Sequence, residues 1–156
     1  TPGQGSVFEV FLPITAQDPG AGEEQIVLAV PRGGNERIMV VDDENSILRS
    51  IQELLEDFGY RVQVCSDGKK AFDLFEKNPL GVDLVITDMT MPSMTGEELS
   101  RQMLGLRPDL PVILCTGYNR MISEKGALGL GIRRFLHKPV DTDELLFIVR
   151  DVLDGN

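Results

Sequence analysis

The stretch RIMVVDDE, residues 37–44, combines a continuous apolar run with a group of acidic residues. An unbroken apolar run follows Arg37, which is typical of a strand that is buried on both faces of a parallel sheet. Acidic residues come directly after this run, at Asp42, Asp43 and Glu44. The stretch therefore predicts a buried strand over 37–41 that is followed directly by acidic residues.

Outward from this stretch, apolar runs alternate with helical patterns along the rest of the chain. Further strands are predicted at 61–65, 83–87, 110–115 and 133–137. Helical spacing of apolar residues predicts helices over 45–58, from Ser66 or Asp67, from Thr95, over 119–129 and from Asp141. The second of these helices is expected to bury Ala71, Leu74 and Phe75.

Two of the predicted helices begin with the spacing of a capping box, Thr95 with Glu98 and Asp141 with Glu144. Strand and helix units in regular succession predict an α/β fold. Short loops and right-handed crossovers then give a doubly wound parallel sheet with helices on both faces. Ligands of such sheets bind beyond the carboxyl ends of the strands, so the residues there are the candidates for chemistry.

The composition argues against several classes of partner. Among 156 residues, 15 basic and 25 acidic side chains give a formal net charge of −10. This charge disfavours a nucleic-acid surface, which needs a basic face, and an anionic membrane surface. Cys65 and Cys115 each end an apolar run, so we expect two buried thiols in a reducing cytosol. No apolar run approaches the roughly 20 residues of a membrane span, and we expect a cytoplasmic location.

Polar side chains follow four of the five predicted strands. Asp42 and Asp43 follow the first strand, Asp88 the third, Thr116 the fourth and Lys138 the fifth. Each alone is an ordinary turn or cap residue, but their joint occurrence at these strand ends is hard to attribute to chance. Crowded carboxylates resist joint ionisation, and a divalent cation such as Mg²⁺ removes that conflict. The set suits phosphoryl transfer to a carboxylate, with Asp88 as the best nucleophile.

Four segments closely resemble the receiver domain of two-component response regulators: VVDDE, DLVITDMTMPSMTG, ILCTG and FLHKP. The resemblance covers about residues 37 to 154. It implies a flavodoxin-like (βα)5 fold with strand order 2-1-3-4-5. It also implies a signalling domain that phosphorylates and dephosphorylates itself, with the phosphate supplied by a histidine kinase or a histidine phosphotransfer domain.

The resemblance assigns a role to each residue of this edge. Asp88 would be the phospho-acceptor. Asp43 would bind Mg²⁺ (or Mn²⁺) directly, Asp42 would bind it through water, and Thr90 would lend its backbone carbonyl. Lys138 would contact the phosphoryl group.

The resemblance also implies a switch that transmits phosphorylation to a partner surface. Thr116 would turn toward the phosphate, and Phe135 would move inward to fill the space that Thr116 leaves. The fourth helix, fifth strand and fifth helix would form the surface that changes, and Tyr118 would tune the phosphate lifetime. The Lys138–Pro139 bond would be cis. His137 is interpreted as a local surface or edge residue, so the phosphoryl donor comes from another domain.

The first 36 residues precede the predicted domain. GQGSVFEVFLP, residues 3–13, resembles the closing strand of a histidine-kinase ATP-binding domain. We therefore predict a kinase remnant at 1–13, a linker at 14–36 with a possible short strand at 25–30, and a receiver domain at 37–156. The parent chain would be a hybrid histidine kinase, membrane-bound or not, although this segment lacks the kinase site. The orphaned strand over 6–12 is expected to pair with 25–30 or with a second chain, as a dimer.

Three other functions stay open at this point. A phosphatase with an aspartate nucleophile would want a second acid two residues after Asp88, where Thr90 stands. A receiver-like fold could serve only as a protein-interaction module, although the intact acid, threonine and lysine set argues against this. A nucleotide site at GLGIRR, residues 129–134, lacks a third glycine and precedes a strand, so its signal is weak.

Overall fold

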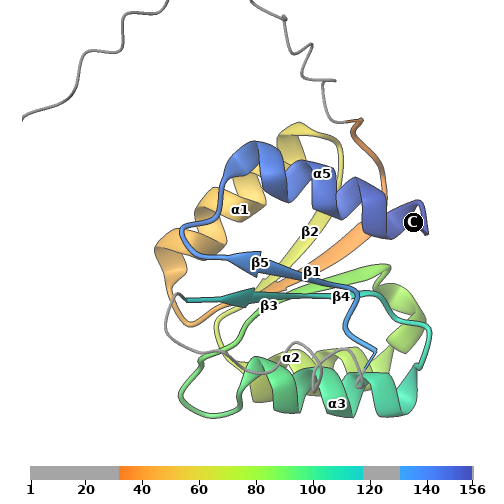
Figure 1. The fold of residues 1–156 in the computed structure, drawn as a ribbon. Coiled ribbons are helices and arrows are strands. Elements are labelled where there is room, and N and C mark those ends of the chain that lie inside the picture. Colours follow the sequence, from red (N-terminus) through yellow and green to blue (C-terminus); the bar gives the residue numbers. More distant parts are fainter. Residues whose placement is uncertain (1–31, 118–130, 156) are drawn as a thin grey trace, which may run out of the picture.

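The computed structural model describes residues 32–117 and 131–155. Their core is a five-stranded parallel sheet in the order β2-β1-β3-β4-β5, which confirms the expected order (Figure 1). The strands are β1 (Arg37–Val41), β2 (Arg61–Cys65), β3 (Leu84–Asp88), β4 (Val112–Thr116) and β5 (Arg134–His137). The helices are α1 (Asn45–Asp57), α2 (Gly68–Lys77), α3 (Gly96–Leu106) and α5 (Thr142–Leu153), with a 3₁₀ turn at Pro79–Gly81.

Helices cover both faces of the sheet. Figure 1 shows α1 and α5 on one face and α2 and α3 on the other. Successive side chains of β1 alternate between these layers, with Ile38 and Val40 in the core under α1 and α5, and Met39 and Val41 in the core under α2 and α3. All four are only 1% exposed. The continuous apolar run in β1 is therefore explained by burial on two faces.

The register of the strands brings their carboxyl ends to one edge. Val41, the last residue of β1, pairs with Thr87 of β3, and Asp88 pairs with Cys115 of β4. Thr116 of β4 in turn pairs with His137, the last residue of β5. Residues that end or follow these strands are thus neighbours in space although they are distant in sequence.

Local side-chain bonds fix where the helices begin. Asp67 caps α2 by accepting a hydrogen bond from the backbone N–H of Lys70. The capping box at the start of α3 is complete, with Thr95 and Glu98 bonding each other's backbone N–H, which confirms that prediction. Asp141 caps α5 by accepting hydrogen bonds from the backbone N–H groups of Asp143 and Glu144. The described contacts there show the N-cap bond of the expected capping box, without the return bond from the Glu144 side chain.

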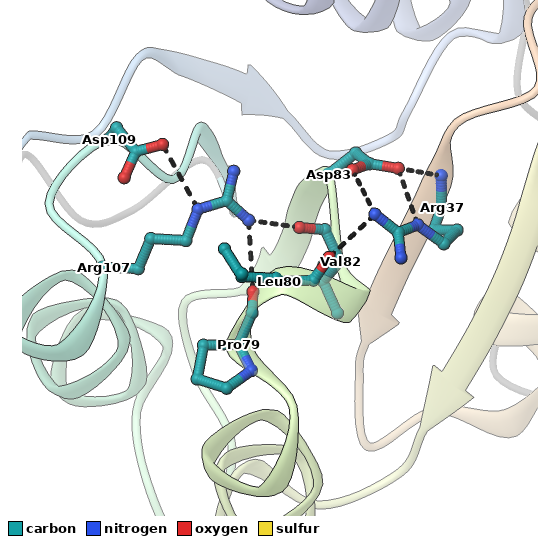
Figure 2. A network of polar contacts seen from close by, with 7 residues as sticks. All are labelled: Arg37, Pro79, Leu80, Val82, Asp83, Arg107 and Asp109. Atoms are coloured by element: carbon teal, nitrogen blue, oxygen red, sulfur yellow. Dashed lines mark hydrogen bonds and ion pairs between the residues drawn. The ribbon is translucent and has the colours of Figure 1, made fainter.

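A polar network at the opposite edge of the sheet ties β1 to β3 and α3 (Figure 2). The guanidinium of Arg37 donates to both carboxylate oxygens of Asp83, at 2.9 and 2.7 Å. Arg107, which follows α3, donates to the carbonyl oxygens of Pro79 and Val82 in the turn before β3. These contacts hold the 3₁₀ turn against the sheet, and the sequence pattern did not predict them.

The segment that enters β1 packs on the domain. Gly34 donates its N–H to the carbonyl of Phe58 at 3.0 Å, and the Glu36 carboxylate forms an ion pair with Arg150 of α5 at 2.9 Å. A Cβ added at Gly33 would lie 2.1 Å from the Phe58 carbonyl oxygen, so only glycine fits this approach. The chain is therefore held to α5 and to the α1–β2 turn before the sheet begins.

Several expectations are corrected in detail. The strand expected at 83–87 is observed at Leu84–Asp88, and the one expected at 110–115 is observed at Val112–Thr116. Leu74 is 41% exposed instead of buried, because α2 turns only the face of Ala71 and Phe75 into the core. The helix expected over 119–129 and the strands expected at 6–12 and 25–30 lie outside the described residues. Within the described part, no helix is both long and apolar enough to span a membrane.

Candidate functional site

Two aspartates and one lysine meet at the carboxyl edge of the sheet. Asp42 follows β1, Asp88 ends β3 and Lys138 follows β5. The Lys138 Nζ lies 2.7 Å from Oδ2 of Asp42 and 2.7 Å from Oδ1 of Asp88. The structure thus brings together three of the residues that the sequence placed at this edge.

Backbone N–H groups orient both carboxylates. The Oδ1 atom of Asp42 accepts a hydrogen bond of 2.8 Å from the N–H of Glu44. The Oδ2 atom of Asp88 accepts one of 2.7 Å from the N–H of Thr90. In each acid one oxygen is therefore held by the N–H two residues further on, as in an Asx turn, while the other faces Lys138.

The cluster keeps an excess of negative charge in a largely buried place. The side chains of Asp42 and Asp88 are only 4% and 7% exposed, and that of Lys138 is 21% exposed. Burial acts to lower the pKa of Lys138, but hydrogen bonds and charge attraction from Asp42 and Asp88 outweigh it and raise the pKa above its usual value. One ammonium faces two carboxylates, so the site favours a further cation.

The donor set of this site is compatible with Mg²⁺. Within residues 32–117 and 131–155, no three His, Cys, Asp or Glu side chains lie close enough to hold a metal by themselves. Mg²⁺, however, prefers oxygen ligands and commonly takes only one or two carboxylates together with waters. Asp42 and Asp88 are buried carboxylates at this edge, and Asp43 and Thr90, the other expected contributors, are exposed residues that closely follow β1 and β3. The residues present therefore fit this ion.

Thr116, Phe135 and His137 lie on one face of the sheet, on the neighbouring strands β4 and β5. Thr116 is buried at the end of β4, and its Oγ1 lies 3.3 Å from Nδ1 of His137. Phe135 is partly buried and packs against the core under α2 and α3. His137 is exposed, in agreement with its interpretation as an edge residue. Tyr118 lies outside the described residues.

Gly96 is a residue of this region that the sequence analysis missed. It begins α3, and its N–H donates to the Met89 carbonyl at 3.0 Å. A Cβ at this position would lie 2.1 Å from the backbone carbonyl oxygen of Asp88 and 2.8 Å from Leu114. Its signal in the sequence is a glycine placed directly after the N-cap Thr95, where a helix former would be expected.

The cysteines take no part in this chemistry. Cys65 and Cys115 are free and buried, as predicted. Burial raises the pKa of the Cys115 thiol to about 12 and also raises that of Cys65. Because the thiolate is the reactive form, both side chains are inert packing groups near neutral pH.

Comparison with protein families gives a match over the same part of the chain. The family model of the response regulator receiver domain matches residues 38–150. A crystal structure of a response regulator receiver domain protein from Clostridium thermocellum is similar with a TM-score of 0.73 and 32% identity, covering 76% of this chain and 94% of that one.

Two curated relatives align with different extents of this chain. The response regulator MprA of Mycobacterium sp. (strain KMS) is 34% identical over 117 residues, which cover 75% of this chain and 50% of MprA. The sensor kinase CckA of Brucella abortus (strain 2308) is 26% identical over 159 aligned residues, which cover 97% of this chain and 17% of CckA. The chain thus spans half or less of each relative, and the CckA alignment reaches upstream of residue 38.

Proposed function

The chain belongs to the response regulator receiver domain family of two-component signalling, and we propose that it accepts the phosphoryl group on Asp88. The placement of Asp88 carries this proposal. It ends the central strand β3, is 6% exposed, and has one oxygen on Lys138 and the other on the N–H of Thr90. An acid held in this way presents a carboxylate beside a fixed positive charge, as phosphoryl transfer requires.

The transfer is an in-line displacement at phosphorus. A carboxylate oxygen of Asp88 forms the new P–O bond, and the P–N bond of a phosphohistidine breaks. The electron pair of that bond stays on the donor imidazole, which takes up a proton and leaves neutral. Lys138 lies beside Asp88 and stabilises the charge on the phosphoryl oxygens through its ammonium group.

A bound Mg²⁺ (or Mn²⁺) would supply Lewis-acid stabilisation of the phosphoryl oxygens. Asp43, Asp88 and the backbone carbonyl of Thr90 would hold it directly, with Asp42 acting through water. The excess negative charge around Asp42 and Asp88 supports this assignment. Asp42 also holds Lys138 in place through its 2.7 Å ion pair.

Phosphorylation would bias a two-state equilibrium at the end of β4. The phosphate adds about two negative charges, and Thr116 donates its hydroxyl to one of the new oxygens. Phe135 then moves inward from its partly buried position in β5. The partner surface would comprise β5, α5 and the segment between β4 and β5, and the domain would switch by a shift in population.

The similarity to CckA supports an origin in a hybrid histidine kinase. The alignment with that sensor kinase covers 97% of this chain, whereas the receiver match begins at residue 38. On this proposal residues 1–13 close an upstream kinase domain, residues 14–36 lead to the receiver, and the parent chain is cytoplasmic or membrane-bound. The partners are a histidine kinase or a histidine phosphotransfer domain, and on the same proposal residues 6–12 pair either with residues 25–30 or with a second chain.

An intact-mass experiment tests the assignment of Asp88. The protein is incubated with Mg²⁺ and acetyl phosphate, and we expect a mass increase of one phosphoryl group. Asp88→Asn should lose this increase, while Asp73→Asn, a matched change on the exposed face of α2, should retain it. An unlabelled wild type, or labelling of Asp88→Asn equal to wild type, would overturn the proposal, with circular dichroism confirming that each variant is folded.

A further inference from the structure

Thr116 and His137 are joined by the register of the sheet. They end the neighbouring strands β4 and β5 and pair directly across the ladder. The Thr116 carbonyl accepts a 2.8 Å hydrogen bond from the N–H of Lys138, which fixes the backbone at this point. Because paired residues of neighbouring strands project to the same face, the register brings the two side chains within reach of each other, and Oγ1 lies 3.3 Å from Nδ1.

The two side chains differ in burial. Thr116 is only 7% exposed, so the residue lies largely out of contact with solvent. His137 is exposed, so a substitution there leaves no cavity in the core. The histidine ring can therefore be changed without disturbing the packing around Thr116.

A hydroxyl group has a single proton to donate. If Thr116 donates that proton to Nδ1 of His137, it cannot donate the same proton to a phosphoryl oxygen on Asp88. The two acceptors therefore compete for one donor proton. The hydrogen bond to His137 stabilises the orientation of Thr116 in the unphosphorylated state, and so it disfavours the turn of Thr116 toward the phosphate.

We propose that His137 is a positioning residue, which holds the Thr116 hydroxyl in the unphosphorylated state and thereby sets the threshold of the switch. The proposal assigns the ring proton to Nε2, so that Nδ1 accepts. It rests on the proposed function, because Thr116 needs a phosphoryl oxygen on Asp88 as the alternative acceptor. Loss of one hydrogen bond of ordinary net strength changes such an equilibrium by about two- to tenfold.

The test uses trifluoroberyllate, a phosphoryl mimic, titrated with Mg²⁺ into the whole chain and followed by NMR. His137→Leu removes the acceptor and should tighten the apparent affinity by about two- to tenfold. His137→Asn keeps a polar atom near the position of Nδ1 and should restore wild-type affinity, whereas His137→Gln, whose polar atoms lie near Nε2, should resemble His137→Leu. In the Thr116→Val background, which has no hydroxyl, the same substitutions should have no effect.

The outcomes separate this inference from the function on which it rests. If wild type does not bind trifluoroberyllate, the proposed function fails and the inference fails with it. If wild type binds and His137→Leu has the same affinity or a weaker one, the function stands and the role of His137 is refuted. An effect of His137→Leu that persists in the Thr116→Val background would show a merely structural role, which also refutes it.

Discussion

Asp42 and Lys138 are 96 residues apart in the sequence, yet Oδ2 of Asp42 lies 2.7 Å from Nζ of Lys138. The contact joins the residue after β1 to the residue after β5, across the carboxyl edge of the sheet. Because Asp88 shares the same ammonium, Lys138 is the counter-ion of two buried carboxylates at once. The lysine should therefore matter for stability as well as for phosphoryl transfer.

Lys138→Met should destabilise the fold. It leaves Asp42 and Asp88 buried without their counter-ion, and breaking a buried ion pair typically costs about 3–5 kcal/mol. Because the lysine side chain is 21% exposed, we expect a smaller loss, about 2–3 kcal/mol in the free energy of unfolding by urea denaturation. Mg²⁺ should recover part of this loss, whereas Lys69→Met, at an exposed position of α2, should change stability little. An equal loss in both variants would contradict the counter-ion role.

The sequence placed Asp42, Asp88 and Lys138 at one edge because the ends of buried strands are local signals, and parallel topology carries them to the same side. It could not show that one oxygen of each acid binds a backbone N–H, since that depends on turn geometry. The Arg37–Asp83 pair was likewise missed, because it joins surface charges 46 residues apart with no periodic pattern. Leu74 was wrongly assigned to the core because helical spacing alone does not fix how far the apolar face extends around α2.

Gly96→Ala should destabilise the domain and slow phosphorylation. The new Cβ would lie 2.1 Å from the carbonyl oxygen of Asp88, so the backbone that carries the acceptor would have to shift. We expect a loss of about 1–3 kcal/mol, as for other overpacked sites, together with slower labelling by acetyl phosphate. Gly105, later in the same helix, has open space where its Cβ would lie. Gly105→Ala should therefore stabilise the protein by about 0.5–1 kcal/mol; the same response at both positions would refute this account.

Both cysteines should resist thiol reagents in the folded protein. Cys65 and Cys115 are 6% and 2% exposed, and burial raises the pKa of Cys115 to about 12. At pH 8 almost none of this thiol is ionised, so its reaction with dithionitrobenzoate should be slow and should accelerate as urea unfolds the chain. Cys115→Ser serves to assign the signals. Rapid labelling of both thiols in native buffer would show that the core around β2 and β4 opens readily.

Asp83→Asn should weaken the fold in a pH-dependent way. Hydrogen bonds from the Arg37 side chain lower the pKa of Asp83 below its ordinary value, against the opposing effect of burial. A carboxyl group whose pKa is lower in the folded state stabilises that state above its unfolded pKa of about 3.9, and this contribution is lost as the pH falls through the folded value. The difference in free energy of unfolding between wild type and Asp83→Asn should thus be largest near pH 6–7 and shrink below about pH 4. Repeating the comparison in an Arg37→Met background should reduce this pH dependence, because the side-chain hydrogen bonds that lower the pKa of Asp83 most are gone, while the backbone N–H of residue 37 still donates to it. A difference between wild type and Asp83→Asn that stays constant from pH 7 to pH 3 would contradict the role of this ion pair.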